Sequence, residues 1–249
     1  FRSGLDYPQD VPPLAEAPAF LRSYVAAMPG LGVHARTHGP GALLLLALLR
    51  SAVGTGELAQ ALALQLLGAA LPLLAWISAR RLLDERGARF AALLVVFSPS
   101  FQLFSFVSME AVFALALSGL LAAGCEALFA AGRARRWAWL AGALGYAAAL
   151  FSFSVSVVAL ILALAALRGL WMGALSRAQV LGALWRAALA AFTCHAAVFS
   201  ATGFDLVECF RSALVENEQL IASSWSSAET LVFAALGNLA AFAFACGVP

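Results

Sequence analysis

Long apolar runs alternate with short polar segments along most of this chain, and the alternation begins sharply after residue 40. A helix that crosses a lipid bilayer needs about 20 predominantly apolar residues. Two of the runs, 41–53 and 154–167, are shorter than this and must extend into their flanks or form half-helices. The pattern predicts an all-α, multi-pass transmembrane helix bundle, with apolar runs at 41–53, 58–79, 90–107, 109–131, 137–152, 154–167, 178–200 and 228–247.

Residues 1–40 differ from the rest because they are polar and rich in proline, which favours extended or turning backbone. From Ala19 onward, apolar residues recur on one helical face, which predicts a short helix lying in the membrane interface. We therefore divide the chain into an extracytoplasmic loop with an interfacial helix, 1–40, and a transmembrane helical bundle, 41–249, incomplete at both ends. The stripe comprises Phe20, Leu21, Tyr24, Val25 and Met28, with Arg22 and Ser23 facing water.

The composition supports a membrane protein, because 63% of the residues are hydrophobic and only 11% are charged. Soluble domains carry about 25% charged residues. The glycine-rich nucleotide loops and the short motifs of serine hydrolases and zinc proteases are absent from the sequence. The four cysteines lack the paired spacing of a metal or redox site. We therefore expect no cofactor and no nucleic-acid partner, and nothing indicates a divalent metal.

The distribution of charge predicts sidedness. Arginines cluster at 80–89, at 133–136, and at Arg168 with Arg177, which the positive-inside rule places in the cytoplasm. A loop predicted at 201–227 is mostly acidic and is placed outside, together with Arg36 and His38. If 41–53 crossed the membrane completely, the N-terminal loop would lie inside. Either 41–53 does not cross fully, or the first arginine cluster breaks the rule.

Candidate chemistry gathers where the chain enters the first apolar run. Asp6 and Asp10 lie in the N-terminal loop, and His34, Arg36 and His38 stand just before residue 41. A carboxylate can take a proton from an acceptor hydroxyl, and imidazole or guanidinium groups can bind a phosphate. In the alternative interpretation, His34 and Arg36 are interface residues that extend toward water.

A polar loop, an aromatic interfacial helix and then Thr37-His38-Gly39-Pro40-Gly41 resemble the GT-C superfamily of membrane glycosyltransferases. That superfamily includes protein O-mannosyltransferases and aminoarabinose transferases. Farther along, Ser98-Pro99-Ser100 and Met109-Glu110 resemble its Ser-Pro stretch and a later acidic position, where Asp is usual. Gly39 stands where the superfamily usually has proline, and we expect this to loosen the turn.

The resemblance implies a glycosyltransferase that moves a sugar from a polyprenyl-phosphate-linked donor to an acceptor at the outer face. It implies a bacterial inner (cell) membrane location and membrane lipid as a partner, and it leaves the acceptor open. Asp10 or Asp6 would be the catalytic base, while Arg36, His38, His34 and Glu110 would bind the substrate. The alternatives are a non-enzymatic transporter or channel subunit and a catalytically inactive relic of the superfamily.

Two further expectations concern polar residues inside apolar runs. A charge in hydrocarbon is expensive, so Glu126, near the predicted inner end of its run, is expected either to extend toward the interface or to pair with Arg133. The serines at positions 152, 154 and 156 are expected to be small packing residues of a helix.

Overall fold

The computed structural model describes residues 7–98, 109–130, 132–224, 232 and 236, and every element in these residues is helical. The elements are η1 Tyr7–Asp10, η2 Leu14–Glu16, α1 Ala17–Ala27, η3 Met28–Gly30, α2 Val33–Arg36, α3 Gly41–Val53, α4 Glu57–Gly68, α5 Leu71–Ala79, α6 Glu85–Phe97, α8 Glu110–Phe129, α9 Ala134–Phe151, α10 Val155–Trp171, α11 Arg177–Thr202 and α12 Leu206–Ser224. Most of the run predicted at 228–247, and Asp6, lie outside the described residues.

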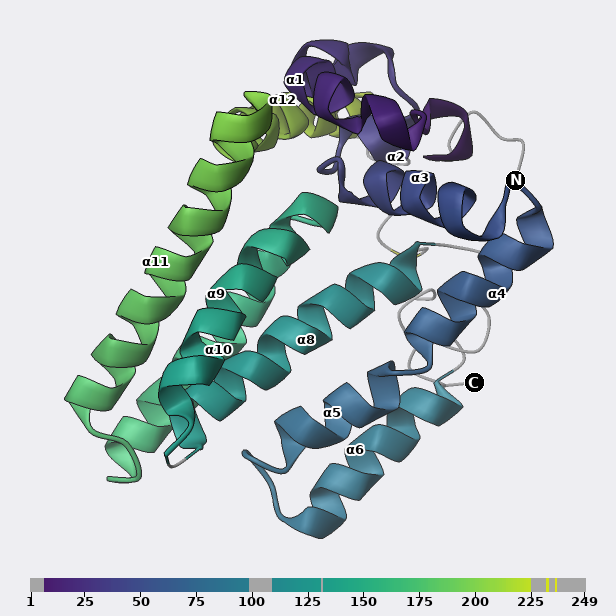
Figure 1. The fold of residues 1–249 in the computed structure, drawn as a ribbon. Helices are drawn as coiled ribbons and strands as arrows, with labels where there is room; N and C mark the ends of the chain where they lie inside the picture. The colour runs from purple at the N-terminus through teal and green to yellow at the C-terminus, as the bar shows by residue number, and fades with distance from the viewer. Residues whose placement is uncertain (1–6, 99–108, 131, 225–231, 233–235, 237–249) are drawn as a thin grey trace.

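The helices α4, α5, α6, α8, α9, α10 and α11 lie side by side, and α1, α2, α3 and α12 gather at one end of them (Figure 1). Within the described residues, three helical stretches are long and apolar enough to cross a membrane: Glu57–Ala79, Glu110–Phe129 and Arg177–Thr202. Gly41–Val53 and Val155–Trp171 are apolar but shorter, as the sequence predicts. The predicted run 58–79 is interrupted after Gly68 and resumes at Leu71. Pro72 lies in the first turn of the second segment, where the missing backbone donor of proline is tolerated.

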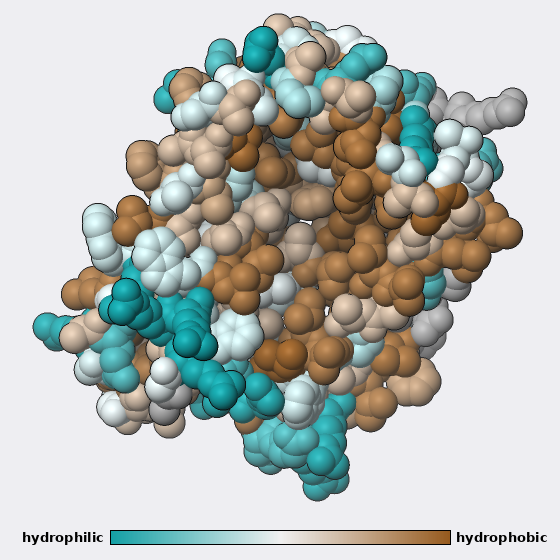
Figure 2. All heavy atoms as spheres, viewed as in Figure 1, coloured by the Kyte–Doolittle hydropathy of each residue, from teal (hydrophilic) through white to brown (hydrophobic). Residues whose placement is uncertain are grey.

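Hydrophobic side chains cover much of the outer surface of the long helices, while polar residues gather at the two ends (Figure 2). On α10 and α11, Leu164, Leu167, Phe192 and Trp185 are each more than half exposed. Exposed apolar surface of this extent is unfavourable in water and favourable against lipid chains. The three long apolar helices and these exposed faces together indicate association with a membrane.

Helix α1 has the apolar face that the sequence predicts. Tyr24 and Met28 are fully buried, and Phe20, Leu21 and Val25 pack against the same core cluster. Arg22 and Ser23 are exposed. The Tyr24 hydroxyl donates to the carbonyl oxygens of Ala35, at 2.7 Å, and His38, at 3.0 Å, which fastens α1 to the segment entering α3.

The predicted loop at 201–227 is wrong, because residues 206–224 form α12. The Asp205 carboxylate accepts from the backbone N–H of Val207 at 2.7 Å and so begins the helix. Cys209 and Ala213 then fall on one face and are buried against η3 and α1. This period of four residues is the helical signal that the acidic composition concealed.

Helix α3 lies across the end of the bundle instead of running along it (Figure 1). Its first residue, Gly41, packs on the last turn of α9, and Arg50 near its other end donates to the Pro8 carbonyl oxygen. Both ends of α3 thus stay with the N-terminal segment. This geometry favours the first of the two topological alternatives, in which 41–53 does not cross fully.

The three arginine clusters lie at the opposite end, and the cluster at 133–136 starts α9 directly after α8. Arg80 and Arg81 bind Glu126 near the end of α8. Phe129 of α8 lies close to Gly169 and Leu175, between which α10 ends and α11 is about to begin. Arg36 and α12 lie together at the other end, joined by an ion pair with Glu216. The predicted grouping of charges is therefore present in the fold, while the membrane side that each end faces stays a prediction.

The predicted pair of Glu126 with Arg133 is wrong. The Glu126 carboxylate is 3% exposed and accepts two bonds of 2.7 Å from Arg81 and one of 3.1 Å from Arg80. The pairing depends on tertiary structure, because α5 packs along α8. The arginines that follow α5 therefore reach the Glu126 carboxylate from a neighbouring helix, near the end of α8 at Phe129.

Candidate functional site

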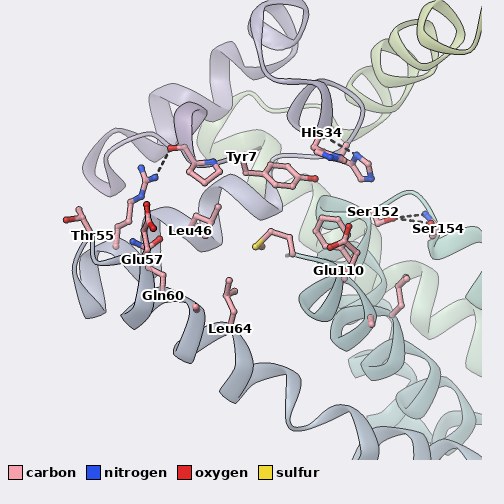
Figure 3. Close-up of a pocket in the computed structure, with 18 residues that line it drawn as sticks. Tyr7, His34, Leu46, Thr55, Glu57, Gln60, Leu64, Glu110, Ser152 and Ser154 are labelled. Carbon is pink, nitrogen blue, oxygen red and sulfur yellow. Dashed lines mark hydrogen bonds between the residues drawn. The ribbon is translucent and has the colours of Figure 1, made fainter. Parts of the chain in front are cut away.

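A cavity of about 630 Å³ opens where the N-terminal segment meets the long helices (Figure 3). Its walls come from η1, α2, α3, the start of α4, the start of α8 and the turn between α9 and α10. Polar lining residues from these elements are Tyr7, His34, His38, Arg50, Thr55, Glu57, Gln60, Glu110, Ser152 and Ser154. Apolar lining residues are Leu46, Ala61, Leu64, Met109, Phe113, Ala114 and Leu117, together with Pro8.

Three of the residues that the sequence singles out meet in this cavity: His34, His38 and Glu110. Arg36 and Asp10 are not among the residues that line it. The histidine side of the cavity and the first turn of α8 are therefore predictable from the sequence, whereas Arg36 and Asp10 lie outside the cavity.

The Asp10 side chain hydrogen-bonds to nearby backbone and does not face the cavity. Its Oδ2 accepts from the backbone N–H of Gly32 at 2.8 Å, which holds η1 against the segment just before α2. This bond explains how the proline-rich segment returns to the entrance of α3. A general base must reach the acceptor hydroxyl, and the wall of the cavity does not include this carboxylate.

Arg36 faces α12. Its Nε lies 3.7 Å from Oε2 of Glu216, and the two side chains are 26% and 13% exposed. The pair joins α2 to α12 across the end of the bundle. A phosphate held in the cavity would not meet Arg36, because this residue does not line it.

His38 is fixed in one orientation by its neighbours. Its ring stacks on Phe113 with a centroid distance of 5.6 Å and an interplanar angle of 23°. Its Nδ1 lies 3.0 Å from the carbonyl oxygen of His34, which can only accept a hydrogen bond. The Thr37 hydroxyl, 3.1 Å from Nδ1, already donates to the Val33 carbonyl oxygen. We therefore assign the proton to Nδ1, which leaves Nε2 of the neutral ring as an acceptor.

Burial lowers the pKa of His38 from its ordinary value of 6.5, although the bond to the His34 carbonyl opposes this. Near pH 6.5 the unfolded chain binds a proton at His38 more readily than the folded protein does. The free energy of unfolding should therefore fall as the pH drops through 6.5. Thermal unfolding between about pH 5 and pH 8 should show this slope. The His38→Asn variant, which keeps a donor at the same place, should show a smaller one. Equal slopes in both proteins would contradict the assignment.

Tyr7 forms part of the cavity wall, with its ring 5.8 Å from that of His34 and edge-on to Phe113 at 6.3 Å. It projects toward the side of His34 and Glu110 (Figure 3). The residue is 7% exposed, and its hydroxyl has no hydrogen-bond partner. Sequence reasoning missed it, since a lone tyrosine in a polar loop carries no pattern.

Arg50 and Glu57 also line the cavity, and neither was predicted from the sequence as a site residue. Arg50 lies in the last turn of α3 and donates to the Pro8 carbonyl oxygen at 2.6 Å, which places it beside Tyr7. Glu57 begins α4, where a carboxylate suits the helix dipole. An arginine within the apolar run 41–53 was the available signal, because charges inside such runs are costly.

The expectation for two of the serines is wrong. Ser152 and Ser154 lie in the turn between α9 and α10, where the Ser152 hydroxyl accepts from the Ser154 backbone N–H at 3.2 Å. Both line the cavity. They end one helix and begin the next, instead of packing between helices.

The cavity therefore combines two kinds of surface. Histidine, carboxylate, arginine and hydroxyl groups occupy the end next to the N-terminal segment. Apolar residues of α4 and α8 line the part that continues along the long helices, among them Leu64 and Leu117. An amphiphile with a polar head and a long hydrocarbon tail fits this division. Among the described residues, no group of three or more His, Cys, Asp or Glu side chains is arranged to hold a metal ion.

Comparison of the chain with protein families, with curated proteins and with solved structures finds no match.

Proposed function

We propose that this chain is the multi-pass membrane part of a glycosyltransferase that moves a sugar from a polyprenyl-phosphate donor to an acceptor hydroxyl. The observation that carries the proposal is the cavity at the end of the helices. It combines two histidines, Arg50 and the carboxylates of Glu57 and Glu110 with apolar walls from α4 and α8. The sequence resemblance to GT-C enzymes around His38 supports it, because that motif forms part of the same cavity.

The arrangement of charge supports an outer location for the reaction. The arginine clusters lie at the end away from the cavity. By the positive-inside rule, this end faces the cytoplasm. The cavity then faces outward, in the inner membrane of a bacterium. Because α3 lies across the bundle, the N-terminal segment stays on the cavity side without a further crossing.

The donor is proposed to lie with its tail along the apolar residues of α4 and α8, including Leu64, Ala114 and Leu117. Its phosphate would meet Arg50, whose guanidinium keeps donors beyond the one bound to Pro8. Arg50 replaces Arg36 in this role, because Arg50 lines the cavity and Arg36 does not. Neutral His38 offers an acceptor to a hydroxyl group and no positive charge to the phosphate.

The transfer step exchanges one bond for another at the anomeric carbon. The bond from that carbon to the phosphate oxygen breaks, and its electron pair leaves with the polyprenyl phosphate. A bond forms to the acceptor oxygen, whose proton passes to a carboxylate. We assign this base to Glu110 instead of Asp10 or Asp6, because Glu110 lines the cavity in the first turn of α8.

The Glu110→Gln variant should lower sugar transfer at least about 100-fold, because a positioned base contributes that much. It should bind undecaprenyl phosphate as wild type does. Transfer is measured with the protein in bacterial membranes supplied with radiolabelled polyprenyl-phosphate hexoses and pentoses. Glu218→Gln is the matched control, since Glu218 is an exposed carboxylate of α12 outside the cavity.

The same experiment separates the proposal from its rivals. Wild-type protein that binds undecaprenyl phosphate and transfers no sugar would contradict the transferase and favour a transporter or an inactive relic. Wild-type protein that binds no polyprenyl lipid would remove the basis for both the donor and the superfamily assignment. Full activity of Glu110→Gln would support the transferase activity but contradict the assignment of Glu110 as the base, which would then be another carboxylate.

A further inference from the structure

We propose that the Tyr7 hydroxyl is the hydrogen-bond donor that recognises the sugar of the donor lipid, on the side of the cavity formed by His38, Phe113 and Glu110. The inference rests on the proposed function and adds the sugar-binding part of the same cavity. Tyr7 would be a binding residue that sets specificity, while the proton transfer stays with Glu110.

The burial of Tyr7 is the first observation. The residue is 7% exposed, yet its hydroxyl has no partner in the protein. Buried hydroxyl groups are nearly always hydrogen-bonded, because an unpaired one loses its bonds to water without replacement. Tyr7 belongs to the core cluster and also lines the cavity, and its hydroxyl points toward the side of His34 and Glu110 (Figure 3). A ligand that fills this side of the cavity brings an oxygen to the hydroxyl, and this oxygen is the partner that the position provides for.

The chemistry of the surroundings indicates which ligand group lies there. His38 presents Nε2 as an acceptor, Glu110 presents a carboxylate, and Tyr7 presents a donor. Aromatic rings form the wall between them, with His38 stacked on Phe113 and Tyr7 edge-on to it. A sugar ring needs both acceptors and a donor for its hydroxyl groups, and it offers C–H faces to aromatic rings. A phosphate would be repelled by the carboxylate and suits Arg50 better.

The protonation state of Tyr7 agrees with this role. Burial, and then the charge of Glu110, raise the pKa of the phenol above its ordinary value. The hydroxyl therefore keeps its proton at physiological pH and remains a donor.

Tyr24 provides a matched comparison within the same end of the protein. It is fully buried, and its hydroxyl already donates to the carbonyl oxygens of Ala35 and His38. Removing that hydroxyl leaves buried carbonyl groups unpaired, which destabilises the fold. Removing the Tyr7 hydroxyl breaks no bond within the protein. The two phenylalanine variants should therefore fail in different ways.

The experiment compares Tyr7→Phe and Tyr24→Phe with wild type in detergent micelles. Thermal unfolding is measured without added lipid, and binding is titrated with undecaprenyl phosphate and with its hexose and pentose derivatives. Tyr7→Phe should keep the melting temperature and the affinity for undecaprenyl phosphate. Its affinity for the preferred sugar derivative should fall about tenfold. Tyr24→Phe should melt about 2–6 °C lower and keep the preference of wild type for the sugar derivative.

Each other outcome overturns the inference in a distinguishable way. Equal loss of affinity for both kinds of lipid would place Tyr7 at the phosphate or the tail. A lower melting temperature for Tyr7→Phe would give its hydroxyl a structural role. Wild-type protein that binds undecaprenyl phosphate and prefers no sugar derivative would leave Tyr7 without a sugar to recognise. Wild-type protein that binds none of the lipids would contradict the proposed function itself.

Discussion

An alanine at position 39 is expected to lower the free energy of unfolding by about 3 kcal/mol, the upper part of the usual range for overpacking. The backbone at Gly39 lies directly against the last turn of α9, and a Cβ there would overlap the carbonyl oxygen of Leu150. Gly41 touches the same peptide, where a Cβ would lie 2.8 Å from that oxygen. Neither neighbour is a flexible side-chain end, so the two segments would have to separate.

The effect is measured by thermal or denaturant unfolding of the purified protein, followed by its tryptophan fluorescence. Gly30→Ala is the matched control, because a Cβ at Gly30 meets nothing within 4 Å. It should change the free energy of unfolding by less than about 0.5 kcal/mol. A Gly39→Ala protein as stable as wild type would show that α9 and the turn before α3 are not packed this closely.

This contact changes the interpretation of Gly39. Glycine in place of proline predicts a loosened turn, whereas the structure shows a close approach that excludes larger residues. Because the turn carries His38, the distance between α3 and α9 also sets where the imidazole stands against Phe113. Stability and cavity geometry are therefore coupled at this position.

Local periodicity was enough to predict much of the fold. The apolar stripe of α1, the short lengths of α3 and α10 and the long apolar helix α8 all follow from the spacing and length of apolar runs. These features depend on residues within a few helical turns of one another. Helix α12 has the same helical spacing of apolar residues, although its acidic residues favoured the prediction of a loop.

The cavity could be predicted only in part, because its walls come from segments far apart in the chain. His38 and Glu110 were found through a motif. Arg50 and Ser152 became neighbours of them only because α3 lies across the bundle and packs on the end of α9. Sequence spacing does not give the direction in which a side chain points, so Arg36 was grouped with the cavity although it faces Glu216.

Removing both Arg80 and Arg81 is expected to destabilise the fold by about 3–5 kcal/mol, because it leaves a charge buried without a partner. The Glu126 carboxylate is 3% exposed, within a helix long and apolar enough to cross a membrane. Arg81 contributes a bidentate contact, with two bonds of 2.7 Å, and Arg80 a single bond of 3.1 Å. Arg81→Ala alone should cost about 1–3 kcal/mol, since Arg80 still pairs with the carboxylate.

The controls distinguish the loss of a pair from the loss of surface charge. Arg89→Ala breaks the pair with Glu85, whose side chains are 73% and 52% exposed, and should cost about 0.5 kcal/mol or less. Adding Glu126→Met to the Arg80→Ala, Arg81→Ala double variant removes the buried charge and should restore most of the lost stability. Unfolding by denaturant measures all of these proteins. If the methionine gave no recovery, the arginines would stabilise the end of α8 through packing on α5 and not through the charge of Glu126.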